Sequence, residues 1–538
     1  MSAPRDKTAR AGGTPDDPSV ATNRPSSGDE HPGSSLQGSA ALNGLPWATT
    51  ESLSGWGRTS RVKSTVVAPA NAAQAASVLT TAHRGASAKV ASTQRGAHHG
   101  TDGEPEHVAT LDRLRAGARR GVIARGLGRS YGDAAQRAGG LVAEMTSMDT
   151  LRAWDPSTGE VTVDAGMSLD TLMRLLIPRG WFTPVTPGTR QVTVGGAIAA
   201  DVHGKNHHHD GSFGVHVNRL RVVTPNGIEE LSPDVEAERD RFWATVAGMG
   251  LTGIVLDATV RLLAVQTAFM RVETSRMNDL DDTMAYLEEG DTKFRYSVAW
   301  LDCLARGSHL GRSVITLGDH ASTADLPRGL TDNPLSFCPV TRLSLPMAPP
   351  RGTLSSPSVR LFNATWFHKA PRRPRTSIEP LANFFHPLDG VRGWNLLYGP
   401  LGFVQYQVVV PFGAEDALRA ILETLAASRC PSFLAVLKRF GAASLARLAF
   451  PRPEWTLALD IPRGPRNLPQ LLNGFDDLVA AAGGRVYLAK DARLRPHHLA
   501  EMYPRLAQWR QTRSMMDPGG LMRSDLASRL HLIDPLQQ

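Results

Sequence analysis

Cysteine and long apolar runs are scarce in this chain of 538 residues. Its cysteines, Cys303, Cys338 and Cys430, stand far apart without a Cys-x-x-Cys pair, which indicates neither a zinc site nor a disulfide framework and favours a reducing compartment. No unbroken apolar run approaches the roughly 18 residues of a membrane-spanning helix, and residues 1–44 contain no apolar segment like that of a signal peptide. We therefore expect a protein that is cytoplasmic or peripheral to the membrane, without a signal peptide or transmembrane segment.

Basic residues exceed acidic residues only modestly, 59 to 51, which gives a formal charge of +8. Such an excess favours polyanions, acidic lipid surfaces and phosphorylated substrates without selecting among them. The sequence has no Cys/His finger, no basic and aromatic RNP-like run and no heptad zipper. We therefore expect no nucleic acid as a partner, whereas peripheral association with an anionic membrane is compatible with the charge.

Composition divides the chain into segments of different character. Residues 1–53 are rich in Ser, Gly, Pro, Asp and Thr, and residues 83–106 return to Ala, Ser, Gly, His and charge. Because such segments bury too little apolar surface to offset the loss of chain entropy, we predict a disordered N-terminal tail over 1–53 and a flexible insertion over about 83–106. Alternating runs such as 404–411 and 455–460 predict antiparallel strands between 264 and 483, with a helix over 414–428.

Residues 121–263 carry the mixed pattern of an α+β fold. Residues 159–163 alternate like a strand, and residues 220–223 and 228–231 flank an Asn-Gly turn, which predicts a hairpin. Ser168 is placed to cap a helix with one apolar face, made of Leu169, Leu172, Met173 and Leu176.

Two glycine-rich loops are the most informative feature of the chain. The first spans 125–133 and follows the short apolar run 122–124; the second lies within 183–208 and contains Gly188, Gly195, Gly196 and Gly204. Glycine lacks the Cβ atom, so bare amides can approach a phosphate or a ring edge without steric cost. Two such loops imply a large, phosphate-bearing cofactor.

The two loops resemble the FAD cradle of the vanillyl-alcohol-oxidase-type flavoproteins, in which an Arg-Gly-x-Gly-His-Ser-like turn and a Pro-Gly…Gly-Gly turn grip the pyrophosphate. Within that family, the pattern from about 55 to 533 is most similar to the oxidase subunits of decaprenylphosphoryl-β-D-ribose 2′-epimerases. The resemblance implies an α+β fold with a two-part FAD-binding domain, over 54–263 and 484–538, and an antiparallel-sheet substrate-binding domain over 264–483. Arg129 stands where many relatives carry the histidine that bonds covalently to the flavin, so non-covalent FAD is expected.

The resemblance also assigns residues to the cofactor. It implies that FAD contacts Ala124, Arg125, Gly126, Leu127, Gly128, Arg129, Ser130, Tyr131, Gly132, Asp133, Ala134, Gly188, Thr193, Val194, Gly195, Gly196, Ala200, Asp201, Val202, His203, Val255 and Tyr487. By residue type alone, Tyr131 also fits a turn aromatic packed under a loop, and His203 also fits a structural imidazole that a neighbouring carbonyl satisfies.

Catalysis and substrate binding are assigned by resemblance in the same way. The implied catalytic residues are Lys490, His203 and Tyr131, and the implied substrate-binding residues are Lys205, Trp300, Phe385, Gln405, Gln407, Lys438 and Lys490. Lys490 fits two roles: a base, after desolvation lowers its pKa, or a cation that stabilises an alkoxide. Trp300 and Phe385 fit core positions equally well. No metal site is expected, because adjacent histidines at 207–209 would point to alternate faces of an extended chain.

The resemblance implies a reaction and a partner. FAD-dependent oxidation would convert the 2′-hydroxyl of polyprenylphosphoryl-β-D-ribose to the 2′-keto sugar, and a separate NAD-dependent keto-reductase subunit would complete epimerisation to the arabinose donor for cell-wall arabinan. Two alternatives stay open: an oxygen-using aldonolactone or alditol oxidase of the same fold, and a non-catalytic basic module that binds polyanions. Ala458 stands where relatives carry a cysteine, while Phe385 and Leu396 stand where they carry tyrosine and arginine, which leaves the exact substrate open.

Overall fold

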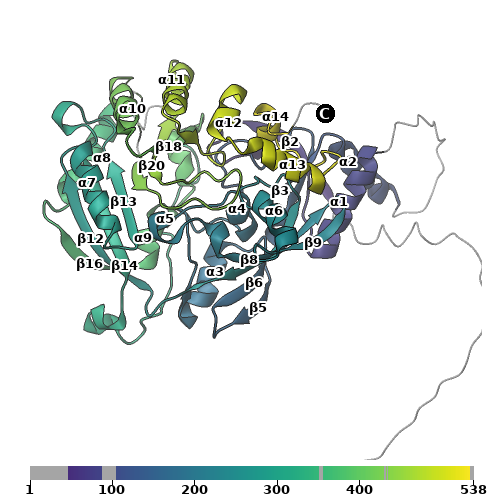
Figure 1. The fold of residues 1–538 in the computed structure, drawn as a ribbon, viewed down its shortest axis with the longest axis horizontal. Helices are drawn as coiled ribbons and strands as arrows, with labels where there is room; N and C mark the ends of the chain where they lie inside the picture. Colours follow the sequence, from purple (N-terminus) through teal and green to yellow (C-terminus); the bar gives the residue numbers. More distant parts are fainter. Residues whose placement is uncertain are drawn as a thin grey trace, which may run out of the picture. The chain divides into compact units, whose positions relative to one another are not determined.

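Helices and mostly antiparallel strands make up the described part of the chain, so the predicted α+β class is confirmed (Figure 1). The computed structural model describes residues 47–87, 104–350, 355–428, 430, 432 and 434–533. The strands of these residues form a four-stranded, a five-stranded and an eight-stranded sheet, together with two small two-stranded ribbons. No helix within the described ranges is long and apolar enough to cross a membrane.

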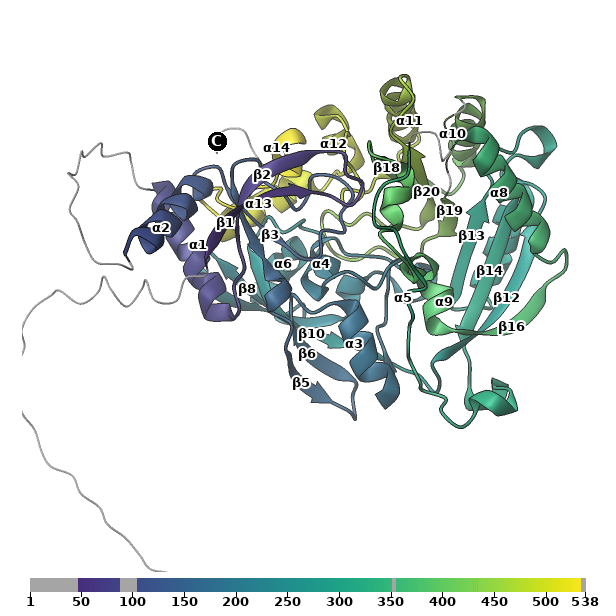
Figure 2. The ribbon, with the colours of Figure 1, turned by 180° about the vertical axis from the view of Figure 1, so that it is seen from behind.

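The four-stranded sheet has the strand order β1-β2-β4-β3. Its strands span Ala48–Ser54 (β1), Arg61–Val67 (β2), Leu141–Glu144 (β4) and Val122–Arg125 (β3). β1 pairs antiparallel with β2, whereas β4 pairs parallel with both β2 and β3. Helices α1 (Ala72–Ser87) and α2 (Glu104–Ala118) pack against each other beside this sheet (Figures 1 and 2).

Each of the two segments that were predicted to lack structure lies partly within the described residues. Of the predicted tail over 1–53, residues 1–46 lie outside the described residues, whereas Ala48–Ser54 pairs along its whole length with β2. The prediction is wrong for that stretch, because backbone pairing holds a strand whose side chains are mostly polar and exposed. Of the predicted insertion over 83–106, residues 83–87 belong to α1 and 104–106 to α2, and residues 88–103 lie outside the described residues.

The five-stranded sheet is antiparallel throughout, in the order β5-β6-β10-β8-β9. Its strands span Leu151–Asp155 (β5), Glu160–Asp164 (β6), Ile254–Arg261 (β10), Val217–Thr224 (β8) and Gly227–Leu231 (β9). The predicted strand is β6, and the predicted hairpin joins β8 to β9. Helix α3 (Leu169–Leu176) begins at the predicted cap, since the Ser168 side chain accepts a hydrogen bond from the Thr171 amide and the four predicted apolar residues are buried.

The eight-stranded sheet is also antiparallel and has the order β16-β12-β14-β13-β19-β20-β18-β21. Its strands span Arg375–Pro380 (β16), Phe269–Met277 (β12), Ser313–His320 (β14), Tyr296–Leu301 (β13), Ala435–Arg439 (β19), Glu454–Pro462 (β20), Phe403–Pro411 (β18) and Arg485–Val486 (β21). Helix α7 (Leu280–Asp291) lies in front of this sheet in Figure 1, and α8 (Ser356–Lys369) lies in front of its other face in Figure 2. The predicted helix over 414–428 is α10 (Glu415–Ser428), and α11 (Leu468–Ala481) follows β20.

The C-terminal segment returns to the first sheet. Val122 of β3 donates a backbone hydrogen bond to the carbonyl of Leu521 and accepts one from the amide of Arg523, each over 2.8 Å. The Arg529 guanidinium forms ion pairs with both Asp133 and Asp491, each at 2.8 Å. Helices α12 (Pro496–Met502), α13 (Leu506–Met516) and α14 (Asp525–Arg529) carry the chain along this side (Figure 1). The residues that follow β21 therefore secure the first glycine loop.

Shorter elements connect the sheets and help to shape the site. They are α4 (Val194–Ala199), α5 (His207–Asp210), α6 (Glu236–Thr245), α9 (Leu381–Phe385), β7 (Trp181–Phe182), β11 (Leu263–Ala264), β15 (Leu343–Ser344) and β17 (Val391–Arg392).

Candidate active site

A large cavity, with a volume of about 960 Å³, lies between the glycine loops and the eight-stranded sheet. It is lined by most residues that the sequence assigned to a cofactor: Ala124, Arg125, Gly126, Leu127, Gly128, Arg129, Ser130, Tyr131, Ala134, Gly188, Thr193, Gly195, Gly196, Ala200, Val202, His203, Val255 and Tyr487. It is also lined by every residue assigned to substrate: Lys205, Trp300, Phe385, Gln405, Gln407, Lys438 and Lys490. The fold thus brings both sets to one space.

The glycines of the two loops leave that space open. A Cβ atom on Gly126 would lie 2.2 Å from the Thr193 hydroxyl oxygen, so a side chain there would push the loops apart. A Cβ atom on Gly188 would meet nothing within 4 Å and would instead enter the cavity. The Arg129 side chain lies over the Trp56 ring at 3.8 Å, and its buried Nε has no hydrogen-bond partner among the described residues. A buried donor of this kind fits an anionic ligand, as the phosphates of FAD require.

Four residues assigned to the cofactor do not line the cavity. Val194 is fully buried in the core, and Gly132 packs so tightly that a Cβ atom would lie 2.0 Å from the Asp491 carbonyl oxygen. Asp133 pairs with Arg529. Asp201 accepts hydrogen bonds from the Ser212 and Ser444 hydroxyls and from the Gly214 amide. The carboxylates of Asp133 and Asp201 are thus satisfied within the protein, whereas Val194 and Gly132 are held by packing.

Three lysine side chains enter the cavity together. The Lys438 ammonium lies 3.2 Å from both Nδ1 of His203 and the carbonyl oxygen of Gly204, and the Lys490 ammonium lies 4.0 Å from the centre of the Tyr131 ring. Lys205 donates to the Phe384 carbonyl. Burial lowers the pKa of Lys205 to about 7, and burial together with the charges of Lys205 and Lys490 lowers the pKa of Lys438 to about 7. Burial lowers the pKa of Lys490 to about 8, opposed by the carboxylate of Asp460. The cluster therefore favours an anionic ligand.

His203 stands at the centre of this cluster. Its Nε2 lies 2.9 Å from the Gln407 amide nitrogen, and its ring lies between Phe440 and Tyr487, with ring centres 4.7 and 5.5 Å away. Burial, reinforced by the charge of Lys438, holds the pKa of His203 well below its ordinary value. The imidazole is therefore neutral at physiological pH and accepts a hydrogen bond from Gln407.

Tyr131 and Gln405 belong to a second polar network, which includes an acid that sequence reasoning missed. Gln405 donates to Asp460 over 2.5 Å, and the Tyr398 hydroxyl donates to the same carboxylate over 3.2 Å. Burial raises the pKa of Asp460 to about 6. Asp460 follows Ala458 by two residues on β20, so the alternation that singled out Gln405 and Gln407 would also have identified it.

The aromatic residues of the site have different surroundings. Phe385 is buried beside Phe182 and Tyr296, with ring centres 5.1 and 4.9 Å away, and it also lines the cavity. Trp300 of β13 is partly buried and contacts Trp366 of α8, with ring centres 6.5 Å apart. Trp300 is therefore a wall residue, whereas Phe385 combines the core and cavity roles.

The histidine run at 207–209 does not lie on an extended chain. It forms the short helix α5, so the geometric premise of the prediction was wrong. His207 accepts from the Gly441 amide, His208 lies 3.0 Å from the Phe294 carbonyl oxygen, and Asp210 pairs with Arg295 at 2.6 Å. Each contact ties the segment after the second glycine loop to its surroundings. The run thus has structural partners of its own.

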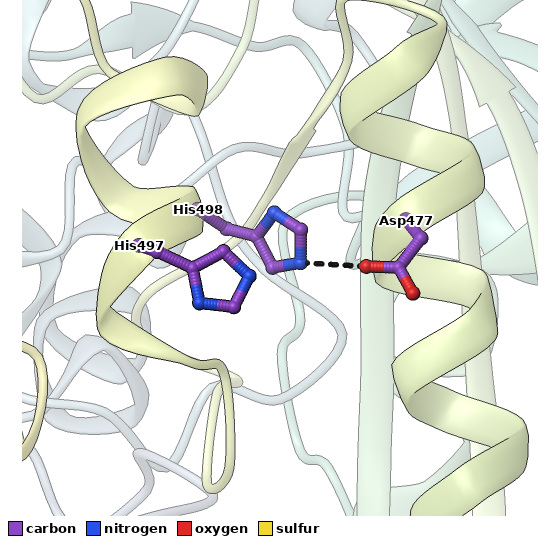
Figure 3. Close-up of side chains that lie close together, drawn as sticks. All are labelled: Asp477, His497 and His498. Atoms are coloured by element: carbon purple, nitrogen blue, oxygen red, sulfur yellow. Dashed lines mark hydrogen bonds and ion pairs between the residues drawn. The ribbon is translucent and has the colours of Figure 1, made fainter.

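Among the described residues, one group of histidine and carboxylate side chains lies close enough together to suggest a metal ion (Figure 3). In this group, His498 of α12 lies 3.0 Å from the carboxylate of Asp477 on α11, with His497 beside it. The Arg495 guanidinium also contacts both: it pairs with Asp477 and lies 2.9 Å from Nε2 of His498. A fixed positive charge on the same two ligands disfavours a cation, so we assign no metal there.

Comparisons with known proteins agree with this geometry. A family model described as FAD binding domain matches residues 103–232, and one described as D-arabinono-1,4-lactone oxidase matches residues 464–530. The chain is 40% identical to decaprenylphosphoryl-beta-D-ribose oxidase of Mycolicibacterium smegmatis over 488 residues, which cover 90% of this chain and 98% of that protein. It is 39% identical to an uncharacterized protein of Streptomyces coelicolor, over 68% of this chain and 100% of that protein. A putative D-arabinono-1,4-lactone oxidase of Neurospora crassa is 31% identical over 29% of this chain and 28% of that protein.

These findings define the class of the protein. It is an FAD-dependent oxidoreductase, as the cavity and the FAD-binding match together require. The chain belongs to the family of decaprenylphosphoryl-β-D-ribose oxidases. The likeness to lactone oxidases is confined to shorter parts of the chain.

Ala458 offers a direct chemical probe of the cavity. It lines the cavity on β20, between Gln407 of β18 and Val436 of β19. Cys303 and Cys430 are buried and Cys338 is exposed, and none of the three lines the cavity. We predict that a thiol-directed covalent reagent will modify position 458 in the Ala458→Cys variant and will leave the cavity of the unchanged protein unmodified. Peptide mass mapping checks this.

Protection supplies the control for that experiment. A ligand in the cavity should slow modification of Cys at 458 and leave the rate at Cys338 unchanged, because Cys338 is exposed elsewhere. A rate at position 458 that is the same with the cavity empty and with the cavity filled would show that position 458 faces outside.

Proposed function

We propose that this enzyme oxidises the 2′-hydroxyl of a polyprenylphosphoryl-β-D-ribose to the 2′-keto sugar, the first half of epimerisation to the arabinose donor for cell-wall arabinan. The observation that carries the proposal is the continuity of one cavity, which is lined by the glycine loops, by three partly buried lysines and by the aromatic wall at Trp300. These three parts of the cavity suit, in the same order, a redox cofactor, a sugar phosphate and a hydrocarbon chain. The family relationship supports the same substrate.

We assign the FAD-binding part to residues 54–263 and 484–538, and the substrate-binding part to 264–483. This division is supported by the return of residues 521–523 to β3 and by the position of the cavity beside the eight-stranded sheet. Bound FAD supplies the two-electron acceptor of the oxidation. We propose that FAD binds non-covalently, because Arg129 offers no nucleophilic ring nitrogen to it.

The three partly buried lysines have different roles in substrate binding and proton transfer. We assign Lys205 and Lys438 to the substrate phosphate, since a phosphate placed between them would restore the charged form that burial disfavours. Lys490 either accepts the proton of the 2′-hydroxyl as a neutral amine or, as a cation, stabilises the alkoxide that remains after this proton has passed to water. Tyr131 supports the ammonium of Lys490 through its ring face. Neutral His203 accepts a hydrogen bond from Gln407 and lies beside the Lys438 side chain.

The keto product requires a second enzyme. Reduction of the 2′-ketone to the opposite configuration consumes a hydride, and we propose an NAD-dependent keto-reductase as the partner subunit that supplies it. The net positive charge of the chain and the apolar end of the cavity also support peripheral association of the enzyme with a membrane.

Two matched substrates test the proposal. We expect a short polyprenylphosphoryl ribose to reduce the bound flavin without oxygen, with one keto sugar formed per flavin. Its 2′-deoxy analogue should bind and leave the flavin oxidised, because it lacks the reacting hydroxyl. Rapid oxidation of D-arabinono-1,4-lactone with release of peroxide, and no reaction with the lipid-linked ribose, would favour the lactone oxidase alternative that the match over 464–530 suggests.

A further inference from the structure

Helix α8 presents apolar side chains to solvent at the rim of the cavity. Its inner face is anchored to the protein: Val359, Asn363 and Phe367 are buried, and Asn363 donates to Asp302 over 2.7 Å. Its outer face carries Leu361, Phe362 and Trp366, which are 71%, 40% and 44% exposed. These three residues are hereafter the α8 face. Large apolar side chains gathered on the outside of a helix mark an interaction surface.

The α8 face is continuous with the cavity. Phe362 and Trp366 both line the cavity, and their rings stack with centres 6.3 Å apart. Trp366 in turn contacts Trp300 on the cavity wall. Helix α7 lies in front of the sheet in Figure 1, whereas α8 lies in front of it in the reverse view of Figure 2, next to β13, which carries Trp300. An aromatic path thus leads from solvent to the interior of the site.

The chain segment that contains the α8 face carries charge of one sign. Residues 333–378 contain no aspartate or glutamate, and the described residues among them include Arg342, Arg360, Lys369, Arg372, Arg373 and Arg375. Arg360 lies on α8 itself, while Arg372, Arg373 and Arg375 follow it directly and are exposed. No ion pair joins any described member of this set to another described residue. Unpaired surface cations beside exposed aromatic and aliphatic groups are the combination that anionic bilayers attract.

We propose that the α8 face docks on an anionic bilayer, so that the hydrocarbon chain of the substrate passes from the membrane into the cavity without crossing water. The inference rests on the proposed lipid-linked substrate. A protein partner would be expected to offer acidic groups to pair with these cations and to cover the apolar face in the absence of lipid. The bilayer is favoured because the face opens into a cavity that must admit an isoprenoid chain.

Vesicle co-sedimentation tests this with the full-length holoenzyme. We expect binding to vesicles that contain phosphatidylglycerol, little binding to phosphatidylcholine alone, and weaker binding as salt rises. Two variants lie outside the cavity lining: Leu361→Glu on the α8 face, and Arg372→Gln combined with Arg373→Gln. The double arginine variant should lower the partition coefficient at least about tenfold, since each cation near the surface contributes roughly fivefold. Leu361→Glu should also lower it, because an apolar side chain is replaced by a charge that anionic lipid repels. Ile228→Glu on the distant strand β9, where Ile228 is 50% exposed, is the matched control and should bind as the unchanged protein does.

The outcomes separate this inference from the proposed function. A short, water-soluble polyprenylphosphoryl ribose should reduce the flavin of Leu361→Glu as fast as that of the unchanged enzyme, which shows that the variant is folded and that its site is intact. Equal vesicle binding by Leu361→Glu and the unchanged protein overturns the docking proposal, as does binding only when a second protein is present. Failure of the short substrate to reduce the unchanged enzyme overturns the proposed function, and the vesicle comparison still decides the docking surface.

Discussion

Replacing Lys490 with methionine is expected to slow reduction of the bound flavin by about 10²- to 10⁴-fold, the range in which a positioned acid or base contributes. Methionine preserves the length of the side chain and removes the amine, so the FAD content should stay at that of the unchanged protein. Anaerobic stopped-flow absorbance at the flavin band, with saturating polyprenylphosphoryl ribose, measures the rate. Lys293→Met, at a lysine that is 58% exposed and paired with Glu289, is the control.

The pH profile of that reduction distinguishes the two roles of Lys490. Its pKa lies at about 8, so the amine is protonated below this value and neutral above it. If the neutral amine accepts the proton of the hydroxyl, the rate rises with pH and levels off above about pH 8. If the cation stabilises the alkoxide, the rate falls through the same interval. A limb that persists unchanged in Lys490→Met would remove this residue from the proton transfer.

Gly188→Leu is expected to give a folded protein that has lost at least about 100-fold in FAD affinity. Apart from its chain neighbours, no described residue has an atom within 4 Å of a Cβ at this position, and its backbone is not left-handed, so the fold should tolerate the side chain. The leucine side chain would then occupy the part of the cavity that we assign to the cofactor. Quenching of flavin fluorescence in a titration of the apoprotein measures the affinity, and thermal unfolding followed by circular dichroism checks the fold.

Gly126→Val provides the contrast to that variant. Its Cβ would collide with the Thr193 hydroxyl at 2.2 Å, so this change should lower the melting temperature of the apoprotein as well as FAD binding. A Gly188→Leu protein that purifies with a full complement of FAD would show that the cofactor does not pass Gly188. We also expect Gly196→Leu to weaken FAD retention, because Gly196 lines the cavity from α4.

Local patterns in the sequence predicted the elements that they themselves stabilise. The Ser168 cap and the Asn-Gly hairpin are short-range features, and both are present as predicted. Strand β1 was missed because its stability comes from pairing with β2, while its exposed polar side chains are of the kind found in disordered tails. Helix α5 was missed because its histidines find partners on segments far along the chain, such as Phe294.

The sequence predicted the glycine loops of the site well, because their backbone geometry restricts the residue type. It predicted less well which partners the polar side chains would contact. The glycine spacing and the family resemblance placed Gly126 and Gly188 in one cavity with Lys490. They did not show that Asp201 points into the protein toward Ser212 and Ser444, since a carboxylate in a cofactor motif reads alike in either orientation. The orientation of such a carboxylate depends on three-dimensional packing, which the periodicity of the sequence does not reveal.

The measurement closest to the central claim is the absorption spectrum of the purified protein before and after anaerobic addition of a polyprenylphosphoryl ribose. We predict an oxidised flavin spectrum that bleaches on addition, with the flavin released unmodified when the protein is denatured. A protein that stays colourless after incubation with FAD, or a flavin band that this substrate leaves unchanged, would contradict the account.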